Sequence, residues 1–270
     1  MSYFDQIRKR RSVRTFDGVA LRTEDAKSIA EFAGRTENPY GIPIEWRLLD
    51  AKRFGLSSPV IVGTDLYLAG KMRRVPHAEE AFGYAFEQVV LFAESIGVGT
   101  TWIAGTMNRE SFERAMELSE DEVMPCVSPL GYPAKKMSLR ETLMRKGVRA
   151  DGRLAFGEVF FDGAFDRPLT VGRAGDLAAA FEAVRLAPSA VNKQPWRVVL
   201  SGEKAHFYEK RSKGYAAGDW DIQKIDVGIA LCHFELAAKE LGRAVSFEIE
   251  DPGIGTEGDV VYIASYAIGG

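Results

Sequence analysis

The second half of the chain repeats the order of sequence patterns found in the first half. Setting Trp46 against Trp196 aligns residues 30–49 with residues 180–199 without a gap. In both segments a helical pattern ends, a proline-containing turn follows, and a strand-like run begins at the tryptophan. Chance agreement between two helix-loop-strand units is the alternative, but the shared order of elements favours an internal duplication.

The two longest predicted helices pair in the same way. Residues 77–97 and residues 221–242 each carry a broad apolar face. Each run ends at a glycine, Gly97 in the first half and Gly242 in the second, as expected at the end of a helix. This second correspondence supports the duplication.

The boundaries of the two copies follow from a stretch with little periodicity. Residues 136–163 are first basic and then glycine-rich, which is typical of a connector. We therefore predict copy one over residues 1–135 and copy two over residues 164–270, together forming one domain. A chain of 270 residues is long enough to bury a sizeable core.

The composition argues against several classes of partner. A formal net charge of −3 and 27% charged residues give no reason to expect nucleic acid or an acidic membrane surface as a partner. No run approaches the ~20 apolar residues of a membrane span, and the first residues lack the apolar segment of a secretion signal. The expected location is the cytoplasm.

The cysteines and histidines do not suggest a metal site. Cys126 and Cys232 lie in apolar contexts without a C-x-x-C spacing, which is typical of small core residues in a reducing compartment. The histidines, His77, His206 and His233, are widely separated, so no metal ion is expected. His233 lies on an apolar helix and is predicted to be a hydrogen-bonded interior residue.

A basic motif, "RKRRSVR", follows a short helical pattern at the start of the chain. The structural interpretation is a solvated helix end whose cations complement the helix dipole, and the motif alone favours it. The functional interpretation is an anion site. Arg10 and Arg11 offer forked donors for a phosphate, and Ser12 adds a hydroxyl. Arg14, one strand step beyond, would point the same way as Ser12.

The stretch "APSAVNKQPW" is more specific than an ordinary turn. A proline ends the preceding helix, and small side chains leave room for a ring system to approach the backbone. Two amides then offer donors and acceptors that suit the edge of a heterocycle. A turn between helix and strand is the alternative, which explains the proline and the polar residues but not their order. The candidate binding residues are Pro188, Ser189, Ala190, Asn192 and Gln194.

Together, "RRSVRTF", "APSAVNKQPW" and "GYAFEQVVLFAESIGVGTTWIAG" resemble the signature regions of the FMN-dependent nitroreductase family. The resemblance covers most of the chain and is to a divergent, single-chain branch of thermophile type. It implies an α+β fold, namely an α/β/α sandwich with a mainly antiparallel central sheet, internally duplicated as a pseudo-dimer. It also implies FMN as the cofactor.

The order of the motifs departs from the family pattern. In most members the two binding motifs lie a few tens of residues apart, and two identical subunits share each flavin. Here copy one has "ENPYGIPIEW" in place of the second motif, and copy two has "AFDRPLTVGR" in place of the first. The resemblance therefore implies a fused pseudo-dimer with one complete and one degenerate flavin site. It leaves open whether the fused chain associates further.

The family roles carry over residue by residue. Arg10, Arg11 and Ser12 would bind the phosphate and the ribityl chain of FMN. Arg14 would approach the N1/O2 edge and stabilise the reduced flavin. The residues that would bind the ring from the other copy are Pro188, Ser189, Ala190, Asn192 and Gln194.

The resemblance implies two further site regions. Ala104 and Gly105 match the turn whose backbone N–H faces flavin N5, although many relatives have an acidic residue at the position of Ala104. The family often supplies a last cation to the phosphate from the basic segment that follows Tyr132. Arg140 is the first candidate for that cation, and Lys136 is the second. A solvated basic helix is an equally good interpretation of the segment.

The implied function is an FMN-dependent oxidoreductase with ping-pong kinetics. NAD(P)H would reduce the flavin at N5, and an electron-poor acceptor such as a nitroaromatic or a quinone would then be reduced. One alternative is another reaction on the same fold, such as dehalogenation, ene reduction or flavin cleavage. A second alternative is a flavin-binding protein with little turnover, because a lone site and the missing acidic residue fit lost catalysis.

Overall fold

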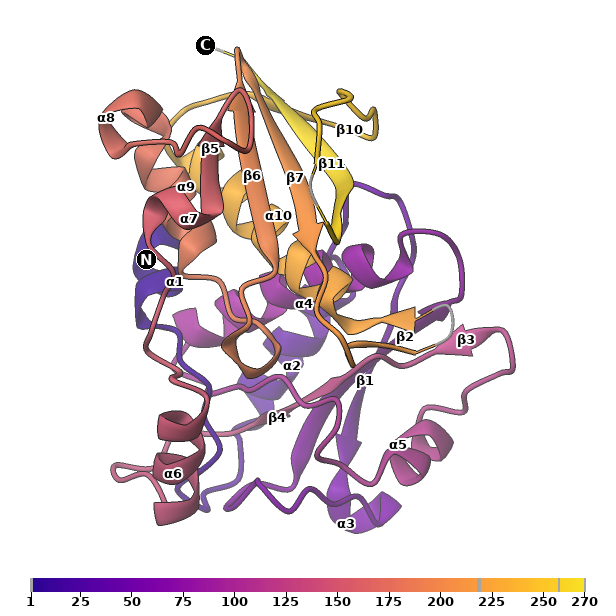
Figure 1. Cartoon of the computed structure of the whole chain (residues 1–270). Helices are drawn as coiled ribbons and strands as arrows, with labels where there is room; N and C mark the ends of the chain where they lie inside the picture. Colours follow the sequence, from indigo (N-terminus) through magenta and orange to yellow (C-terminus); the bar gives the residue numbers. More distant parts are fainter. Residues whose placement is uncertain (1, 218–219, 257, 270) are drawn as a thin grey trace. The chain divides into compact units, whose positions relative to one another are not determined.

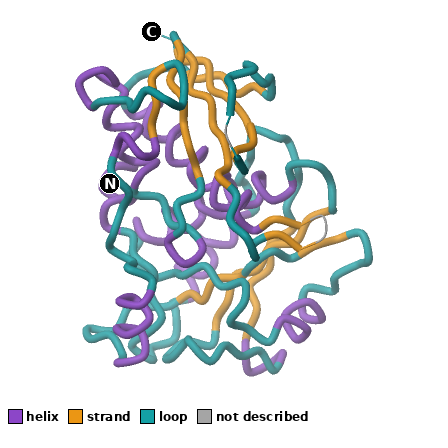
Figure 2. Tube along the Cα trace, viewed as in Figure 1, coloured by secondary structure: helices purple, strands orange, loops and turns teal. Residues whose placement is uncertain are grey.

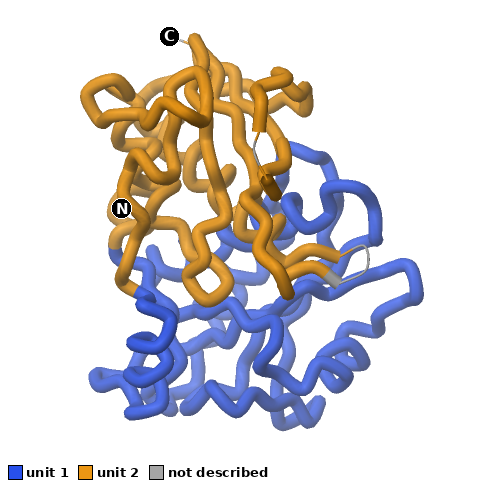
Figure 3. The backbone as a smooth tube through the Cα atoms, viewed as in Figure 1, with its two compact units in different colours: residues 1, 9–150 blue, residues 2–8, 151–270 orange. Residues whose placement is uncertain are grey.

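The chain divides into two compact units, each built from helices and a mainly antiparallel sheet (Figures 1, 2 and 3). Unit 1 contains residues 9–150, and unit 2 contains residues 2–8 together with the chain from Asp151 onward. The boundary between the units therefore falls inside the segment predicted as a connector. The computed structural model describes residues 2–217, 220–256 and 258–269.

Unit 1 has a four-stranded sheet with β2 at its centre, between β1 and β4. After α4 the chain pairs with Val127 of β4 through a bridge at Ile103 and with Gly131, just after β4, through a bridge at Gly99. The helices and strands of unit 1 are α2 (Thr23–Ala33), β1 (Glu45–Asp50), α3 (Ala51–Phe54), β2 (Leu66–Arg73), α4 (Ala78–Ser95), α5 (Arg109–Ala115), β3 (Glu122–Val123), β4 (Val127–Leu130) and α6 (Leu139–Gly147).

Unit 2 has a five-stranded sheet in the order β10-β11-β7-β6-β5, in which only the β5–β6 pair is parallel among the described residues. Its elements are α1 (Tyr3–Lys9), α7 (Phe156–Val159), β5 (Phe160–Asp162), α8 (Val171–Ala174), η1 (Gly175–Leu177), α9 (Ala178–Arg185), η2 (Ala190–Asn192), β6 (Trp196–Ser201), β7 (Lys204–Lys210), β8 (Ala216–Ala217), β9 (Trp220–Asp221), α10 (Ile222–Glu240), β10 (Val245–Glu248) and β11 (Val260–Ile268).

The strand order of unit 1 recurs in unit 2. The central strands β2 and β7 each have antiparallel neighbours on both sides, β1 and β4 in one unit and β6 and β11 in the other. In unit 1 the chain that follows α4 pairs with β4. In unit 2 the chain that follows α10 forms β10, which pairs with β11. Gly97 and Gly242, which follow those helices, have φ values of 78° and 77°. The repeated topology supports the predicted duplication.

The core of unit 1 has an aromatic cluster on one face of its sheet. Trp46 of β1 packs against Phe82 and Phe86 of α4, with ring centroids 5.7 and 5.3 Å apart. Gly70 of β2 permits this approach, because a Cβ at that position would lie 2.5 Å from the Trp46 ring. The opposite face carries a second apolar cluster, in which α5 packs against β1, β2 and β4.

The core of unit 2 centres on Phe234 of α10. Its ring lies 5.6 Å from Phe181 of α9, 5.5 Å from Phe207 of β7 and 5.5 Å from Tyr266 of β11. The neighbouring His233 is fully buried, and its Nδ1 lies 2.8 Å from the carbonyl oxygen of Ala183. The prediction of a hydrogen-bonded interior histidine is confirmed.

The first helix, α1, packs within unit 2. The backbone N–H groups of Tyr3 and Phe4 donate to Oε2 of Glu240 over 2.7 and 3.3 Å. A carboxylate at a helix N-terminus satisfies backbone donors that have no partner inside the helix, and it complements the helix dipole. Glu240 at the end of α10 therefore binds the start of the chain.

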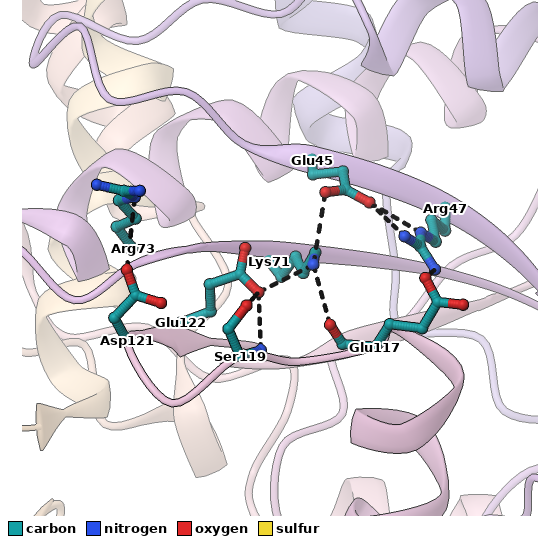
Figure 4. Close-up of polar contacts among 8 residues, drawn as sticks. All are labelled: Glu45, Arg47, Lys71, Arg73, Glu117, Ser119, Asp121 and Glu122. Atoms are coloured by element: carbon teal, nitrogen blue, oxygen red, sulfur yellow. Dashed lines mark hydrogen bonds and ion pairs between the residues drawn. The ribbon is translucent and has the colours of Figure 1, made fainter.

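A polar network joins the strands at one end of the unit 1 sheet (Figure 4). Lys71 donates to Oε2 of Glu122 over 2.9 Å and to the carbonyl oxygen of Glu117 over 3.2 Å. Its ammonium also lies 3.5 Å from Glu45, its cross-strand neighbour on β1. The hydrogen bond from Lys71 and those from Ser119 lower the pKa of Glu122 to about 2, with the Ser119 backbone N–H contributing most. Because these groups satisfy one another, the network is a structural link between strands.

Candidate functional site

The basic motif continues from α1 as an extended segment of unit 1. Val13 donates its backbone N–H to the carbonyl oxygen of Thr100 over 2.8 Å, and its side chain is buried. Side chains alternate along an extended backbone, so Ser12 and Arg14 project to the side opposite Val13. The predicted shared direction of these two side chains agrees with the backbone.

Arg10 has a buried guanidinium beside two acidic residues of α4. Its Nε lies 3.9 Å from Oε1 of Glu87, which is itself fully buried and accepts a hydrogen bond from Trp102 over 3.1 Å. Burial lowers the pKa of Arg10, while Glu87 and Glu94 act in the opposite direction. Among the described residues, Nε of Arg10 has no hydrogen-bond partner.

Arg11 pairs with a buried carboxylate in the first turn of α6. Its Nη1 lies 3.7 Å from Oε1 of Glu141, whose side chain is 1% exposed. In the described part of the chain, neither carboxylate oxygen of Glu141 has a hydrogen-bond partner, and Nη1 of Arg11 has none. Buried polar groups are normally paired, so this region has hydrogen-bonding capacity for a ligand or for ordered water.

Arg14 lies among charges of both signs. Burial lowers its pKa, Glu141 raises it, and Arg145 of α6 lowers it further. Arg145 also lowers the pKa of Arg10, so it is electrostatically close to both arginines of the motif. Neighbouring guanidinium groups destabilise one another unless an anion lies between them. Arg10, Arg14 and Arg145 together form a cluster of positive charge near the carboxylate of Glu141, and such a cluster can bind an anionic group through charge-assisted hydrogen bonds.

The cations predicted after Tyr132 have other surroundings. Arg140 donates from Nη1 to the carbonyl oxygen of Pro59, and Lys136 is exposed ahead of α6. Their predicted role at the phosphate stays a prediction, whereas the charge of Arg145 in the same segment lowers the pKa values of Arg10 and Arg14.

The spacing of Arg145 in the sequence indicated its importance, although residue types alone did not. It follows Glu141 by four residues, and side chains at that spacing share one face of a helix. Glu141 is the partner of Arg11. A cation on the Glu141 face of α6 is therefore placed toward the basic motif.

The turn at Ala104 and Gly105 is fixed by a guanidinium that the sequence did not indicate. Arg109, at the start of α5, donates to the carbonyl oxygens of Ala104 over 3.1 Å, Pro125 over 3.0 Å and Met124 over 2.7 Å. The peptide unit is planar and trans, so fixing the Ala104 carbonyl directs the Gly105 N–H the opposite way. Gly105 is exposed, and a Cβ built there would meet no described atom within 4 Å.

In unit 2, the loop from Pro188 to Gln194 has an unusual backbone. Val191, Asn192 and Gln194 have φ values of 42°, 59° and 50°. A β-branched residue rarely adopts this left-handed region. Strained conformations persist where the surrounding structure holds them, and they cluster at ligand sites. The backbone conformation of the loop, like its sequence, is therefore typical of a binding loop.

The two predicted amides of this loop bind backbone groups nearby. Asn192 donates from Nδ2 to the carbonyl oxygen of Gly152 over 2.9 Å. Gln194 is buried, and its Oε1 accepts from the Leu154 N–H over 3.0 Å. The hydroxyl of Ser189 accepts from the Gln194 N–H over 2.9 Å. These bonds shape the loop, and the contact of both amides with a flavin edge stays a prediction.

Ala190, between Ser189 and the strained residues, has a partner on α10. Its N–H donates to both carboxylate oxygens of Asp226, each over 3.1 Å. Asp226 is 4% exposed, and burial raises its pKa well above the usual range. Sequence reasoning did not single out Asp226, because its partner is a backbone group in a distant loop.

Two classes of feature are not found in the described part of the chain. It contains no group of three or more histidine, cysteine, aspartate or glutamate side chains arranged to hold a metal ion. It also contains no helix with the length and apolar character needed to cross a membrane. Cys126 and Cys232 are both buried.

The sequence and the fold match known proteins over most of the chain. The model of the family described as "Putative TM nitroreductase" matches residues 2–238. A protein from Thermotoga maritima described as a "putative nitroreductase" is 20% identical with a TM-score of 0.65, over 99% of this chain and 93% of that chain. This likeness confirms the predicted nitroreductase-like α+β fold.

Shorter structures align with about half of the chain. A "Putative NADH dehydrogenase/NAD(P)H nitroreductase" from Bacteroides thetaiotaomicron is 21% identical with a TM-score of 0.43, over 50% of this chain and 89% of that chain. An "FMN-dependent Nitroreductase" from Clostridium difficile is 16% identical with a TM-score of 0.42, over 49% of this chain and 88% of that chain. No curated protein matches the sequence.

Proposed function

The chain belongs to the family described as "Putative TM nitroreductase", and from this premise we propose that it is an FMN-dependent oxidoreductase. The observation that carries the proposal is the cluster of Arg10, Arg14 and Arg145 in unit 1. In the same basic motif, the buried Nε of Arg10 and Nη1 of Arg11 have no hydrogen-bond partner among the described residues. Such a cluster fits the phosphate of FMN.

The chain's own residues would have separate roles toward FMN. Arg10, Arg11 and Ser12, with Arg145 beside them, would bind the phosphate and the ribityl chain, and Arg14 would stabilise negative charge at the N1/O2 edge. The Gly105 N–H, directed by Arg109 through the Ala104 peptide, would face N5. Loop residues of unit 2, with Ser189 and Ala190 among them, would contact the ring.

Bound FMN would supply hydride transfer at N5 between reduced nicotinamide and an electron-poor acceptor such as a nitroaromatic or a quinone. The chain would bind and orient the reactants in turn, which gives ping-pong kinetics. Solvent can supply the protons of the reduced product, so the proposal needs no proton-donating side chain.

The first experiment is a titration of the flavin-free chain with FMN, followed by flavin absorbance. We expect one FMN per chain, because copy one has lost the loop sequence and copy two has lost the basic motif. A stoichiometry of two would overturn the degenerate second site. A chain that does not bind FMN would overturn the proposed function.

Anaerobic reduction then separates an oxidoreductase from a flavin-binding protein. We expect NADH or NADPH to bleach the bound flavin and a nitroaromatic to restore its colour. The control is the same mixture without the chain. Flavin that stays oxidised with both nicotinamides would favour a binding protein with little turnover.

A further inference from the structure

We propose that Asp226 is a positioning residue for the flavin, because its buried carboxylate holds the backbone of Ala190 in the binding loop. The inference rests on the proposed function and extends it to a residue of α10. The Ala190 N–H donates to both carboxylate oxygens over 3.1 Å, and Asp226 lies at the start of the second turn of α10. A rigid helix thus anchors the loop through the buried side chain of Asp226.

The loop needs such an anchor because much of its backbone is strained. Val191 and Asn192 follow Ala190 directly and have positive φ values, as does Gln194. Each strained residue costs about 1–3 kcal/mol and persists only where other contacts fix it. The bond to Asp226 fixes the residue immediately before the first strained position.

The duplication provides an independent argument. With Gly97 aligned to Gly242, Ala81 of α4 occupies the position of Asp226 in α10. Ala81 is fully buried, and its methyl group stands where α10 has the carboxylate of Asp226. Copy one also has "ENPYGIPIEW" in place of the binding loop. The carboxylate and the loop are therefore present together in copy two and missing together from copy one, as expected if one serves the other.

Asp226 lies among several ionisable groups. Burial raises its pKa, the hydrogen bond from Ala190 opposes that change, and the charges of Asp221 and Glu209 raise it further. Burial and Asp221 raise the pKa of Glu209 to about 7. Arg211 lies 3.4 Å from Glu209 and 3.9 Å from Asp221. Burial and the charge of Asp226 raise the pKa of Tyr215, and Lys193 lies over the Tyr215 ring.

The charge of Asp226 sets the strength of the anchor. A carboxylate accepts a stronger hydrogen bond from a backbone N–H than a neutral carboxyl group does. The Ala190 bond lowers the pKa of Asp226, so an opening that breaks this bond while Asp226 stays buried becomes more frequent as the pH falls through that pKa. The anchor is therefore expected to make the order of the loop depend on pH.

Hydrogen exchange of the flavin-free chain tests the anchor directly. In the unmodified chain, exchange of peptides covering residues 189–194, corrected for intrinsic rates, should slow in one step as the pH rises. Asp226→Asn should remove that step. In the control Glu209→Gln the step should persist at lower pH, because a neighbouring negative charge is gone. A step that survives in Asp226→Asn would overturn the proposal.

Stability against pH gives a second readout. Asp226 binds its proton more tightly in the folded chain than in the unfolded chain, where its pKa is about 3.9. Its contribution to the free energy of unfolding therefore falls as the pH rises from that value to the folded pKa. The Tm of Asp226→Asn relative to the unmodified chain should rise across the same pH window. A difference in Tm that stays constant across this pH window would show that Asp226 is not the titrating group.

FMN affinity links the anchor to the proposed function. Above the pH of the step, Asp226→Asn should raise the Kd for FMN about tenfold, and below it the two chains should differ little. Comparing the chains at each pH cancels the titration of the FMN phosphate. An unmodified chain that shows the exchange step without binding FMN would overturn the proposed function alone. Equal FMN affinities at every pH would overturn the positioning role alone.

Discussion

Nη2 of Arg109 donates a hydrogen bond to the carbonyl oxygen of Ala104 over 3.1 Å. The same guanidinium holds the carbonyl oxygens of Met124 and Pro125, so a single side chain joins the turn to the chain ahead of β4. Because Ala104 and Gly105 share a peptide plane, Arg109 sets the direction of the Gly105 N–H without contacting a ligand.

Arg109→Lys should slow reduction of the bound flavin with little effect on its affinity. One ammonium cannot reproduce the forked bonds of a guanidinium to three carbonyls. A misplacement of about 1 Å at a reacting centre can cost on the order of 100-fold in rate, and we expect a loss of at least ~10-fold. Anaerobic stopped-flow reduction measures the rate. The control is Arg114→Lys on the same helix, because the exposed side chain of Arg114 pairs with Glu110. Equal rates of flavin reduction in the two variants would refute the role of Arg109.

Arg145→Ala should weaken binding of FMN but not of riboflavin, which lacks the phosphate. Loss of a charge-assisted hydrogen bond is worth about 1.5–3 kcal/mol, or roughly 10- to 150-fold in Kd. Titrations of the flavin-free chain with both ligands measure the difference. Arg140→Ala is the matched comparison, because its guanidinium donates to Pro59 in the structure. If Arg140 binds the phosphate instead, the order of the two effects will be reversed.

Arg14→Ala should make the midpoint potential of the bound flavin more negative. A cation near N1 stabilises the reduced form, and a loss of about 1.4 kcal/mol corresponds to ~30 mV for a two-electron couple. Spectroelectrochemical titration measures the potential, and Arg14→Lys should restore most of it. An unchanged potential in Arg14→Ala would show that Arg14 does not face the ring.

Gly70→Ala should destabilise unit 1 through its core. The added Cβ would lie 2.5 Å from the Trp46 ring and 3.0 Å from the Phe82 ring. Overpacking of this kind costs about 1–3 kcal/mol. Urea unfolding followed by tryptophan fluorescence measures the change. Gly147→Ala in α6 is the control, because a Cβ there meets no described atom within 4 Å, and its free energy of unfolding should stay the same or increase slightly.

The long helices were predictable because their patterns are strong. Helices predicted over 77–97 and 221–242 are observed as α4 and α10, each shorter by a few terminal residues. The helix α6, inside the segment assigned as a connector, was predicted only as one of two interpretations, a solvated basic helix, and without bounds. Its apolar residues Leu139 and Leu143 are 84% and 69% exposed, so no buried stripe marks it. The available signal was Ser138, whose hydroxyl accepts a hydrogen bond from the Glu141 N–H and caps the helix.

The candidate site, too, was predictable only in part. Residue types in "RRSVR" and "APSAVNKQPW" indicated which segments could bind an anion and a ring, because those properties belong to the side chains themselves. The roles of Arg145, Arg109 and Asp226 depend on partners that are distant in sequence or belong to the backbone. The spacing of Arg145 from Glu141 indicates a shared helix face but not the partner across from it, and only the folded chain brings the partners together.

The assignment of α1 to unit 2 limits how the gene of this protein could be divided. Because α1 is bound by Glu240, the chain passes from unit 2 to unit 1 near residue 9 and returns after residue 150. A gene cut after codon 150 would leave α1 on the first fragment, apart from unit 2, and would leave Glu240 on the second fragment without the backbone donors of Tyr3 and Phe4. A transfer of residues 151–270 alone would therefore carry unit 2 without its first helix.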